Sequence, residues 1–166
     1  CATIGCCSAS RLAAYDAVVA TGLAGRCHRI HIERVAVNVA DFRIPDNSGA
    51  QVRGLSLDPE GPDAWLIQPD PHHLVERVAV AGSEAAISNS AGTYLCNAVH
   101  YAQLSWTRPR GVPGVFLHLP PLPGMAAEGA ARCARQVDPE AQMDLELQVR
   151  GVLAIARDLL GLEPSL

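Results

Sequence analysis

The sequence lacks any apolar run long enough to span a bilayer, which takes roughly 20 residues. It also lacks the basic segment followed by an apolar segment that opens a secretory signal. Its 13 basic residues are scattered rather than clustered, and the formal net charge is −4. That balance disfavours nucleic acid and anionic membranes. We therefore expect neither a membrane nor a nucleic acid as partner.

No C-x-x-C pair occurs among the six cysteines, which disfavours a zinc ribbon. The even count would allow a disulfide framework, as in small secreted domains. However, a chain of 166 residues that is 49% hydrophobic can build a core without such links. We expect reduced thiols and a cytoplasmic protein. The cysteines are Cys1, Cys6, Cys7, Cys27, Cys96 and Cys133.

Neither an internal repeat nor a low-complexity tract is present, and the length fits a single domain, 1–166. Apolar patterning predicts strands at 17–21, 30–39 (one strand or a pair), 84–89 and 114–119. It predicts helices ending near 16 and covering 71–82, 93–106 and 138–160, the last beginning at an Asp-Pro cap. Turn formers predict a long functional loop at 41–63. This alternation is typical of an α/β fold, a three-layer α/β/α sandwich around a mixed, mostly parallel twisted sheet.

Cys96 lies in the first turn of a predicted helix, after a strand and a Ser-Ala-Gly turn. The partial positive charge of a helix N-terminus lowers a thiol pKa and favours the thiolate that a cysteine peptidase uses as nucleophile. The alternative interpretation is a small buried core residue, the commonest role of cysteine.

His118 lies at the end of the predicted strand 114–119, just before Pro120. Ligands of open α/β sheets gather at the carboxyl ends of strands, so a base here would meet a thiol at a neighbouring helix start. A hydrogen-bonded histidine without a catalytic role is the equally good alternative.

Glu33 is the acidic exception in the apolar segment 30–39. A buried carboxylate needs a partner. A histidine, which it would orient, is one candidate. An ion pair with Arg34 or Arg43, or an outward position on an edge strand, is the simpler interpretation.

Two other patterns carry little weight. His72 and His73, with His28 and His31, hint at a metal site, but adjacent helical residues point about 100° apart and seldom share an ion. The glycines of 22–25 are too few for a phosphate-binding loop. We expect no metal and no organic cofactor.

Three blocks of the sequence resemble pyroglutamyl-peptidase I, also called pyrrolidone-carboxylate peptidase. The first joins GLAG (22–25), ERVAVN (33–38) and DFRIPDN (41–47). The second is SNSAGTYLCN (88–97), followed by Tyr101, and the third is VFLHLP (115–120). The order glutamate, cysteine, histidine is also that of the family.

This resemblance implies a cysteine peptidase that releases an N-terminal pyroglutamyl residue from peptides through a thioester acyl-enzyme. It implies Cys96 as nucleophile, His118 as base and Glu33 as the residue that holds the imidazole. Arg43 would support the oxyanion. Ile44, Tyr94 and Leu95 would form walls of an apolar pocket for the lactam ring. A homodimer or homotetramer is implied as well.

The chain departs from the family at its start. Family members begin with a strand and a loop of the type T-G-F-x-P-F, whose aromatic residues clamp the substrate ring, and residues 1–16 do not match it. Leu23 replaces the family's usual glutamine. We therefore expect a single peptidase domain without that N-terminal strand and loop. An impaired or non-enzymatic homologue, and a Cys–His hydrolase of another small amide, remain alternatives.

Overall fold

The centre of the fold is a four-stranded sheet of order β1-β6-β2-β5. The computed structural model describes residues 15–46, 48–125, 138 and 140–162. β1 pairs in parallel with β6, and β2 with β5, whereas β2 runs antiparallel to β6. The predicted mixed, mostly parallel sheet is confirmed. The strands are β1 (Val18–Leu23), β2 (Ile30–Glu33), β5 (Ala85–Ser88) and β6 (Gly114–Leu119).

A second, two-stranded sheet is formed by β3 (Val35–Val37) and β4 (Ala64–Leu66), which are antiparallel. The segment 30–39 is thus a pair of strands, divided at Arg34. The Arg34 amide donates to the Ser88 carbonyl, while its own carbonyl accepts from Ile67, so the chain passes from one sheet to the other here. The short β4 was not predicted, because three residues give too little alternation.

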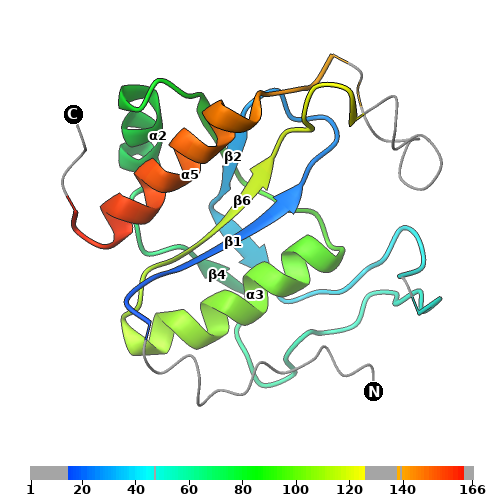
Figure 1. Ribbon diagram of the computed structural model, residues 1–166. Helices are drawn as coiled ribbons and strands as arrows, with labels where there is room; N and C mark the ends of the chain where they lie inside the picture. Colours follow the sequence, from blue (N-terminus) through cyan, green and yellow to red (C-terminus); the bar gives the residue numbers. More distant parts are fainter. Residues whose placement is uncertain (1–14, 47, 126–137, 139, 163–166) are drawn as a thin grey trace.

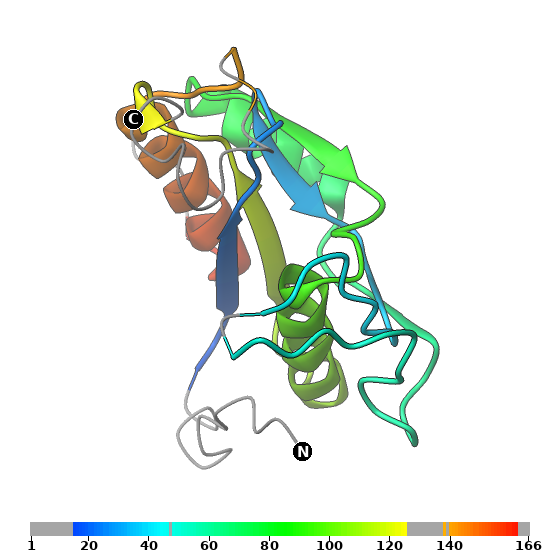
Figure 2. The same cartoon turned by 90° about the vertical axis from the view of Figure 1, so that its right-hand side faces the viewer.

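Helices cover both faces of the main sheet (Figures 1 and 2). α2 (Pro71–Val80) and α5 (Leu145–Leu159) pack together on one face. α3 (Leu95–Thr107), followed by the short 3-10 helix η1 (Arg108–Arg110), covers the other face against β1 and β6. The three-layer α/β/α sandwich is confirmed.

A large part of the hydrophobic core lies between the sheet and the α2–α5 pair, and α3 adds the buried Tyr101 and Leu104. Strand alternation sends one set of side chains to this face and the intervening residues to the α3 face. α2 is initiated by Asp70, whose carboxylate accepts from the His72 amide at 2.9 Å, and by Pro71 in the first turn. The fully buried core residues include Ile30, Ile32, Leu74, Val78, Val115, Leu117 and Ile155.

The last helix begins at Leu145, so the predicted start at Asp138 is wrong. The Asp138 amide donates to the Gly25 carbonyl at 2.7 Å, and the Met143 amide donates to the Pro121 carbonyl at 2.9 Å. The Met143 bond takes the place of the bond that a helix begun at Asp138 would make within itself, and the Asp138 bond ties this segment to the turn after β1. α5 ends as expected before Gly161, which has the left-handed φ of 64°. The helix predicted to end near 16 falls largely outside the described residues.

Within the described ranges, none of the helices combines the length and the apolar character that a membrane crossing requires.

Candidate active site

The α3 face of the sheet carries a cluster of polar side chains from β2 and β6. In the antiparallel register His31 lies opposite His118, and Glu33 lies opposite Phe116. Directly opposed residues project to the same side of a sheet. The imidazole of His118 and the carboxylate of Glu33 are therefore brought together by strand pairing, although 85 positions separate them in the chain.

Glu33 Oε1 lies 2.7 Å from Nδ1 of His118. Glu33 is 1% exposed and His118 is 9% exposed. Because β2 lies between β6 and β5, Glu33 is on an inner strand and not on an outward-facing edge. Of the partners considered for Glu33, a histidine is the one in contact, which satisfies the need of a buried carboxylate for a hydrogen-bond donor.

Cys96 is the second residue of α3 and is half-buried. Its sulfur lies over Gly22 of β1, since a Cβ built on Gly22 would lie 3.1 Å from Cys96 Sγ. Gly22 is the register partner of His118 in the β1–β6 pair. The thiol and the imidazole thus meet at the same level of the sheet, and the thiol interacts with the ring of His118.

These neighbours change the acid–base behaviour of His118. Burial lowers its pKa, but the side-chain interactions with Cys96 and then Glu33, together with their charges, outweigh burial and raise the pKa to about 9. An imidazole of this kind carries its proton at neutral pH and stabilises a thiolate beside it. The arrangement can therefore supply a nucleophile and a proton donor together.

The start of α3 adds hydrogen-bond donors next to the thiol. The first amides of a helix have no intrahelical acceptor, and here they belong to Leu95, Cys96 and Asn97. Tyr94, at the cap position, forms no side-chain cap. Such amides, with the positive end of the helix dipole, are suited to an oxyanion.

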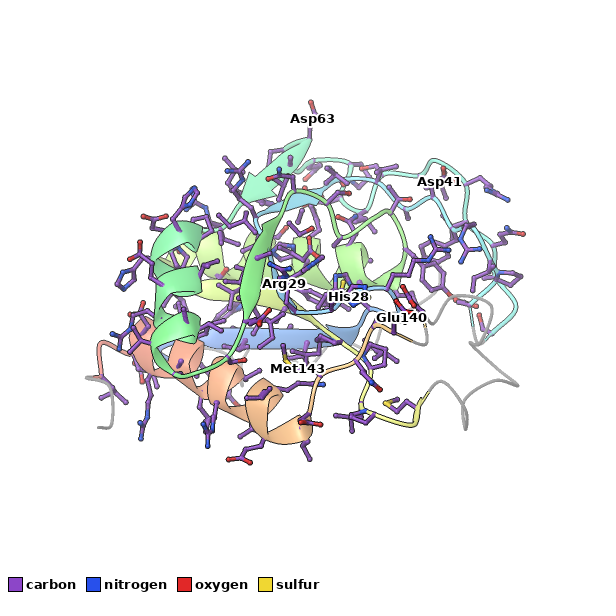
Figure 3. All side chains as sticks on the ribbon, turned by 90° about the horizontal axis from the view of Figure 1, so that it is seen from above. His28, Arg29, Asp41, Asp63, Glu140 and Met143 are labelled. Carbon is purple, nitrogen blue, oxygen red and sulfur yellow. The ribbon has the colours of Figure 1, made fainter. Side chains whose placement is uncertain are left out.

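The loop that begins at Asp41 is attached to the residues just before α3. The Asp41 amide donates to the Thr93 carbonyl at 3.0 Å, and Thr93 Oγ1 donates to the Asp41 carbonyl at 2.8 Å. Figure 3 shows this loop at the end of the molecule away from α2 and α5.

Apolar side chains of this loop lie against Tyr94, the residue just before α3. Tyr94 packs edge-on against Phe42 with ring centroids 4.8 Å apart, and its hydroxyl donates to the Pro45 carbonyl at 3.1 Å. Ile44 is 42% exposed and Leu95 is 37% exposed. The structure therefore brings Tyr94 to the segment that holds Ile44, and the partly exposed Leu95 directly precedes Cys96 in the chain.

Arg43 is exposed on the same loop. Its main-chain carbonyl accepts from Gln51 Nε2 at 3.0 Å. Within the described part of the chain its guanidinium makes neither a hydrogen bond nor an ion pair, so its orientation toward Cys96 is not determined by a contact.

The sequence did not predict the structural roles of two residues that support the site, Asn97 and Gly22. Asn97 is buried and holds α3 to β3, since its side chain accepts from the Val37 amide at 3.0 Å and donates to the carbonyls of Val37 and Val39. Gly22 leaves room for the thiol. A polar residue on the buried side of α3 was the available signal for Asn97. Gly22 carried no such signal in the sequence, because the need for a glycine there arises only when α3 packs over β1.

Cys27 is a second free thiol near the cluster and is buried. Its sulfur lies 3.3 Å from Nδ1 of His31. Burial, and then the charge of Glu33, raises the pKa of the Cys27 thiol, which keeps it protonated and poorly nucleophilic. The remaining cysteines, Cys1, Cys6, Cys7 and Cys133, lie outside the described residues.

Two of the histidines considered for a metal, His28 and His73, each lie beside an aspartate. His73 Nε2 lies 2.8 Å from Asp158 Oδ1, and His28 Nε2 lies 3.7 Å from Asp138 Oδ2. Among the residues that the structure describes, no group of three or more histidine, cysteine or acidic side chains is placed to hold a metal ion.

Known proteins resemble this chain in sequence and in structure. The model of the pyroglutamyl peptidase family matches residues 8–158. Pyrrolidone-carboxylate peptidase 1 of Caldanaerobacter subterraneus subsp. tengcongensis is 40% identical over 115 residues, which are 68% of this chain and 57% of that protein. The pyrrolidone-carboxylate peptidase of Erwinia tasmaniensis is 39% identical over 146 residues, 87% of this chain and 67% of that one.

Solved structures agree with this assignment. The pyrrolidone carboxyl peptidase of the hyperthermophile Pyrococcus furiosus superposes with a TM-score of 0.77 at 34% identity, covering 88% of this chain and 69% of that one. The enzyme from Fervidobacterium islandicum AW-1 gives 0.78 at 31% identity, covering 92% and 72%. The chain spans a little over half the length of several curated relatives that it matches. By the extent of these matches, the chain belongs to the pyroglutamyl peptidase family.

Proposed function

We propose that this chain provides the catalytic residues of a cysteine peptidase that releases an N-terminal pyroglutamyl residue from peptides. The observation that carries the proposal is the buried His118–Glu33 pair at 2.7 Å, next to the Cys96 thiol at the start of α3. Its relatives, which are named pyrrolidone-carboxylate peptidases, support the choice of substrate.

In the first half of the reaction, the Cys96 thiolate attacks the carbonyl carbon of the pyroglutamyl residue. The amides at the start of α3 stabilise the oxyanion that forms. His118 donates its proton to the leaving amine as the C–N bond breaks, which leaves a thioester on Cys96.

In the second half, His118 accepts a proton from water, and the resulting hydroxide equivalent attacks the thioester. The C–S bond breaks, pyroglutamate leaves, and the thiolate is restored beside the protonated imidazole. Glu33 orients the ring through Nδ1 and stabilises its charged form in both halves. No organic cofactor or metal takes part in this scheme.

The lactam ring would occupy the apolar surface next to the thiol, against Ile44, Tyr94 and Leu95. The attachment of the loop to Thr93 and Tyr94 supports this assignment. We assign Arg43 a supporting role at the oxyanion. We propose that residues 1–166 form a single peptidase domain. Because residues 1–16 contain no T-G-F-x-P-F stretch, these residues do not supply the aromatic clamp that the family uses for the substrate ring.

We also propose a cytoplasmic protein that forms a homodimer or homotetramer. The two described cysteines are free thiols, in keeping with a reducing compartment. α5 carries an exposed apolar stripe of Leu145, Val149 and Leu153, of the kind that self-association buries.

The proposal is tested by release of a fluorophore from a pyroglutamyl amide. Cys96→Ser should lower turnover by on the order of 10³-fold or more, because a hydroxyl is a far weaker nucleophile than a thiolate. Cys27→Ser is the matched control, since that buried thiol takes no part in the scheme, and it should retain turnover within about twofold.

Absence of Cys96-dependent turnover in a folded protein would reject the peptidase function and leave an impaired homologue. Turnover of a different small amide, but not of the pyroglutamyl one, would instead identify another Cys–His hydrolase.

A further inference from the structure

His100 is a buried histidine that the proposed reaction does not use. It lies on α3 one turn beyond Cys96 and is 0% exposed. Within the described residues neither of its ring nitrogens has a hydrogen-bond partner, and the same is true of Oε2 of Glu33. Buried polar atoms are nearly always paired, because leaving one unpaired costs the desolvation of that group.

The course of α3 along β6 determines the depth of His100. At the start of the helix Cys96 lies at the level of Gly22 and hence of His118. Toward its end Gln103 donates to the Val115 carbonyl at 3.0 Å. The helix and the strand therefore run in opposite directions, and each turn of α3 descends by about two residues of β6.

His100 consequently lies at the level of Phe116. The two rings are in contact, with centroids 5.7 Å apart and a tilt of 37°. Glu33 is the residue directly opposite Phe116 in the β2–β6 register and projects to the same face. His100 and Glu33 therefore flank one aromatic ring in the same layer, and each has an unpaired polar atom there.

The charge state of His100 fits a donor to a carboxylate. Burial lowers its pKa to about 4, although the charge of Glu33 acts to raise it. At neutral pH the ring is uncharged and carries one N–H donor and one acceptor nitrogen. An ionised carboxylate accepts hydrogen bonds only, so the N–H of His100 is the complementary group.

We propose that His100 is a positioning residue, whose neutral imidazole donates an N–H to Oε2 of Glu33 through one buried water, while Oε1 holds His118. The contact itself is independent of the substrate. Its consequence for turnover rests on the proposed function.

Loss of this hydrogen bond would act on Cys96 through Glu33 and His118. A donor to Oε2 stabilises the ionised carboxylate, which stabilises the imidazolium of His118, which in turn stabilises the Cys96 thiolate. The titratable groups near this layer are Glu33 and His31 from β2, His118 from β6, Cys96 from α3, and Cys27 from the segment between β1 and β2. β1 contributes only Ala20 and Gly22, the register partners of Phe116 and His118.

The test is the pH dependence of Cys96 alkylation by iodoacetamide in the full chain, with the site assigned by mass spectrometry. His100→Phe keeps an aromatic ring against Phe116 and removes both nitrogens. Without the donor, the Glu33 carboxylate stabilises the imidazolium of His118, and through it the thiolate, less well, so the acid limb of the alkylation profile should move up by about one pH unit. If turnover is present, kcat should fall about tenfold with KM within about twofold, because His100 does not touch substrate.

Two amide variants provide the rescue. His100→Asn places an N–H near the position of Nδ1, and His100→Gln places one near that of Nε2. One of them should return the acid limb to its original position. Thr107→Val is the matched control, since Thr107 is also buried on α3 and its hydroxyl also lacks a partner among the described residues. It should leave the profile unchanged.

An unshifted profile in His100→Phe, or an equal shift in Thr107→Val, would overturn the proposal. If His100→Phe does not fold, ¹⁵N-histidine NMR of the unmodified chain decides. The proposal requires a neutral His100 of one tautomer at pH 7, whose N–H signal moves in Glu33→Gln. A signal insensitive to Glu33→Gln would reject it. Alkylation and NMR need no substrate, so they remain decisive even if the pyroglutamyl amide is not cleaved.

Discussion

The Cys96 thiol sits where a strand glycine leaves space for it. Gly22 contacts both the sulfur and the ring of Phe116, since a Cβ at this position would lie 3.1 Å from Cys96 Sγ and 3.0 Å from Phe116 Cζ. Phe116 in turn packs edge-on against His118, with centroids 5.2 Å apart. The absence of a side chain at Gly22 thus leaves the space that the thiol occupies.

Gly22→Ala should displace the thiol because the added methyl group is closer than ordinary van der Waals contact. Cys96 alkylation, and turnover of a pyroglutamyl amide, should fall at least about tenfold, while the free energy of unfolding falls by only about 1–2 kcal/mol. Thr21→Ala is the control, an exposed residue on the same strand. Unchanged alkylation in a folded Gly22→Ala protein would show that the thiol does not depend on this space.

At the scale of elements, the position of α5 depends on a close approach to the sheet. Gly151 is buried in the middle of the helix, where glycine is otherwise unfavourable by about 1 kcal/mol relative to alanine. A Cβ on Gly151 would lie 2.5 Å from Ile30 Cδ1, 3.2 Å from Ser83 Oγ and 3.4 Å from Val78 Cγ1. The glycine therefore lets α5 pack directly on β2 and α2.

Gly151→Ala should lower the free energy of unfolding by about 1–3 kcal/mol, because overpacking outweighs the gain in helix propensity. Urea denaturation measures this change. Glu146→Gln, at an exposed position of the same helix outside the apolar stripe, should change stability by less than about 0.5 kcal/mol. A more stable Gly151→Ala protein would mean that α5 has room to move away from the sheet.

At the scale of the whole molecule, the buried histidine of α3 links stability to pH. The pKa of His100 is lowered from 6.5 to about 4, first by burial and then by the charge of His118, against the opposing effect of Glu33. Between these values the unfolded chain binds a proton that the folded chain does not. The contribution of the neutral His100 to the free energy of unfolding is therefore complete above about pH 6.5. It is lost as the pH falls toward 4.

The free energy of unfolding should therefore fall more steeply in wild type than in His100→Gln between pH 6.5 and 4. The difference between the two should change by about 3 kcal/mol over this range. Urea unfolding at a series of pH values measures the two free energies of unfolding. Taking their difference removes the pH dependence that comes from carboxylates present in both proteins. Parallel pH curves would show that His100 titrates normally in the folded protein.

Much of this protein was determined by local sequence. Asp70 and Pro71 start α2, and the turn before Cys96 starts α3. The apolar alternation of strands and helices led to the three-layer sandwich, and the three blocks to the family. These features depend on residues close together in the chain, whose spacing and capping chemistry can be read directly.

Tertiary structure alone decided the partner of Glu33, the start of α5 and the setting of His100. Glu33 meets His118 because β2 runs antiparallel to β6, a pairing across 85 positions that no local pattern encodes. Asp138 Oδ1 accepts from the Glu140 amide as a helix cap would, yet the Met143 amide bonds to the distant Pro121 carbonyl and the helix starts only at Leu145. In the sequence His100 is an ordinary helical residue, and only the packing of α3 against β6 places it in the buried layer. In each case the deciding contact comes from a distant segment, and the packing of layers, rather than residue spacing, selects it.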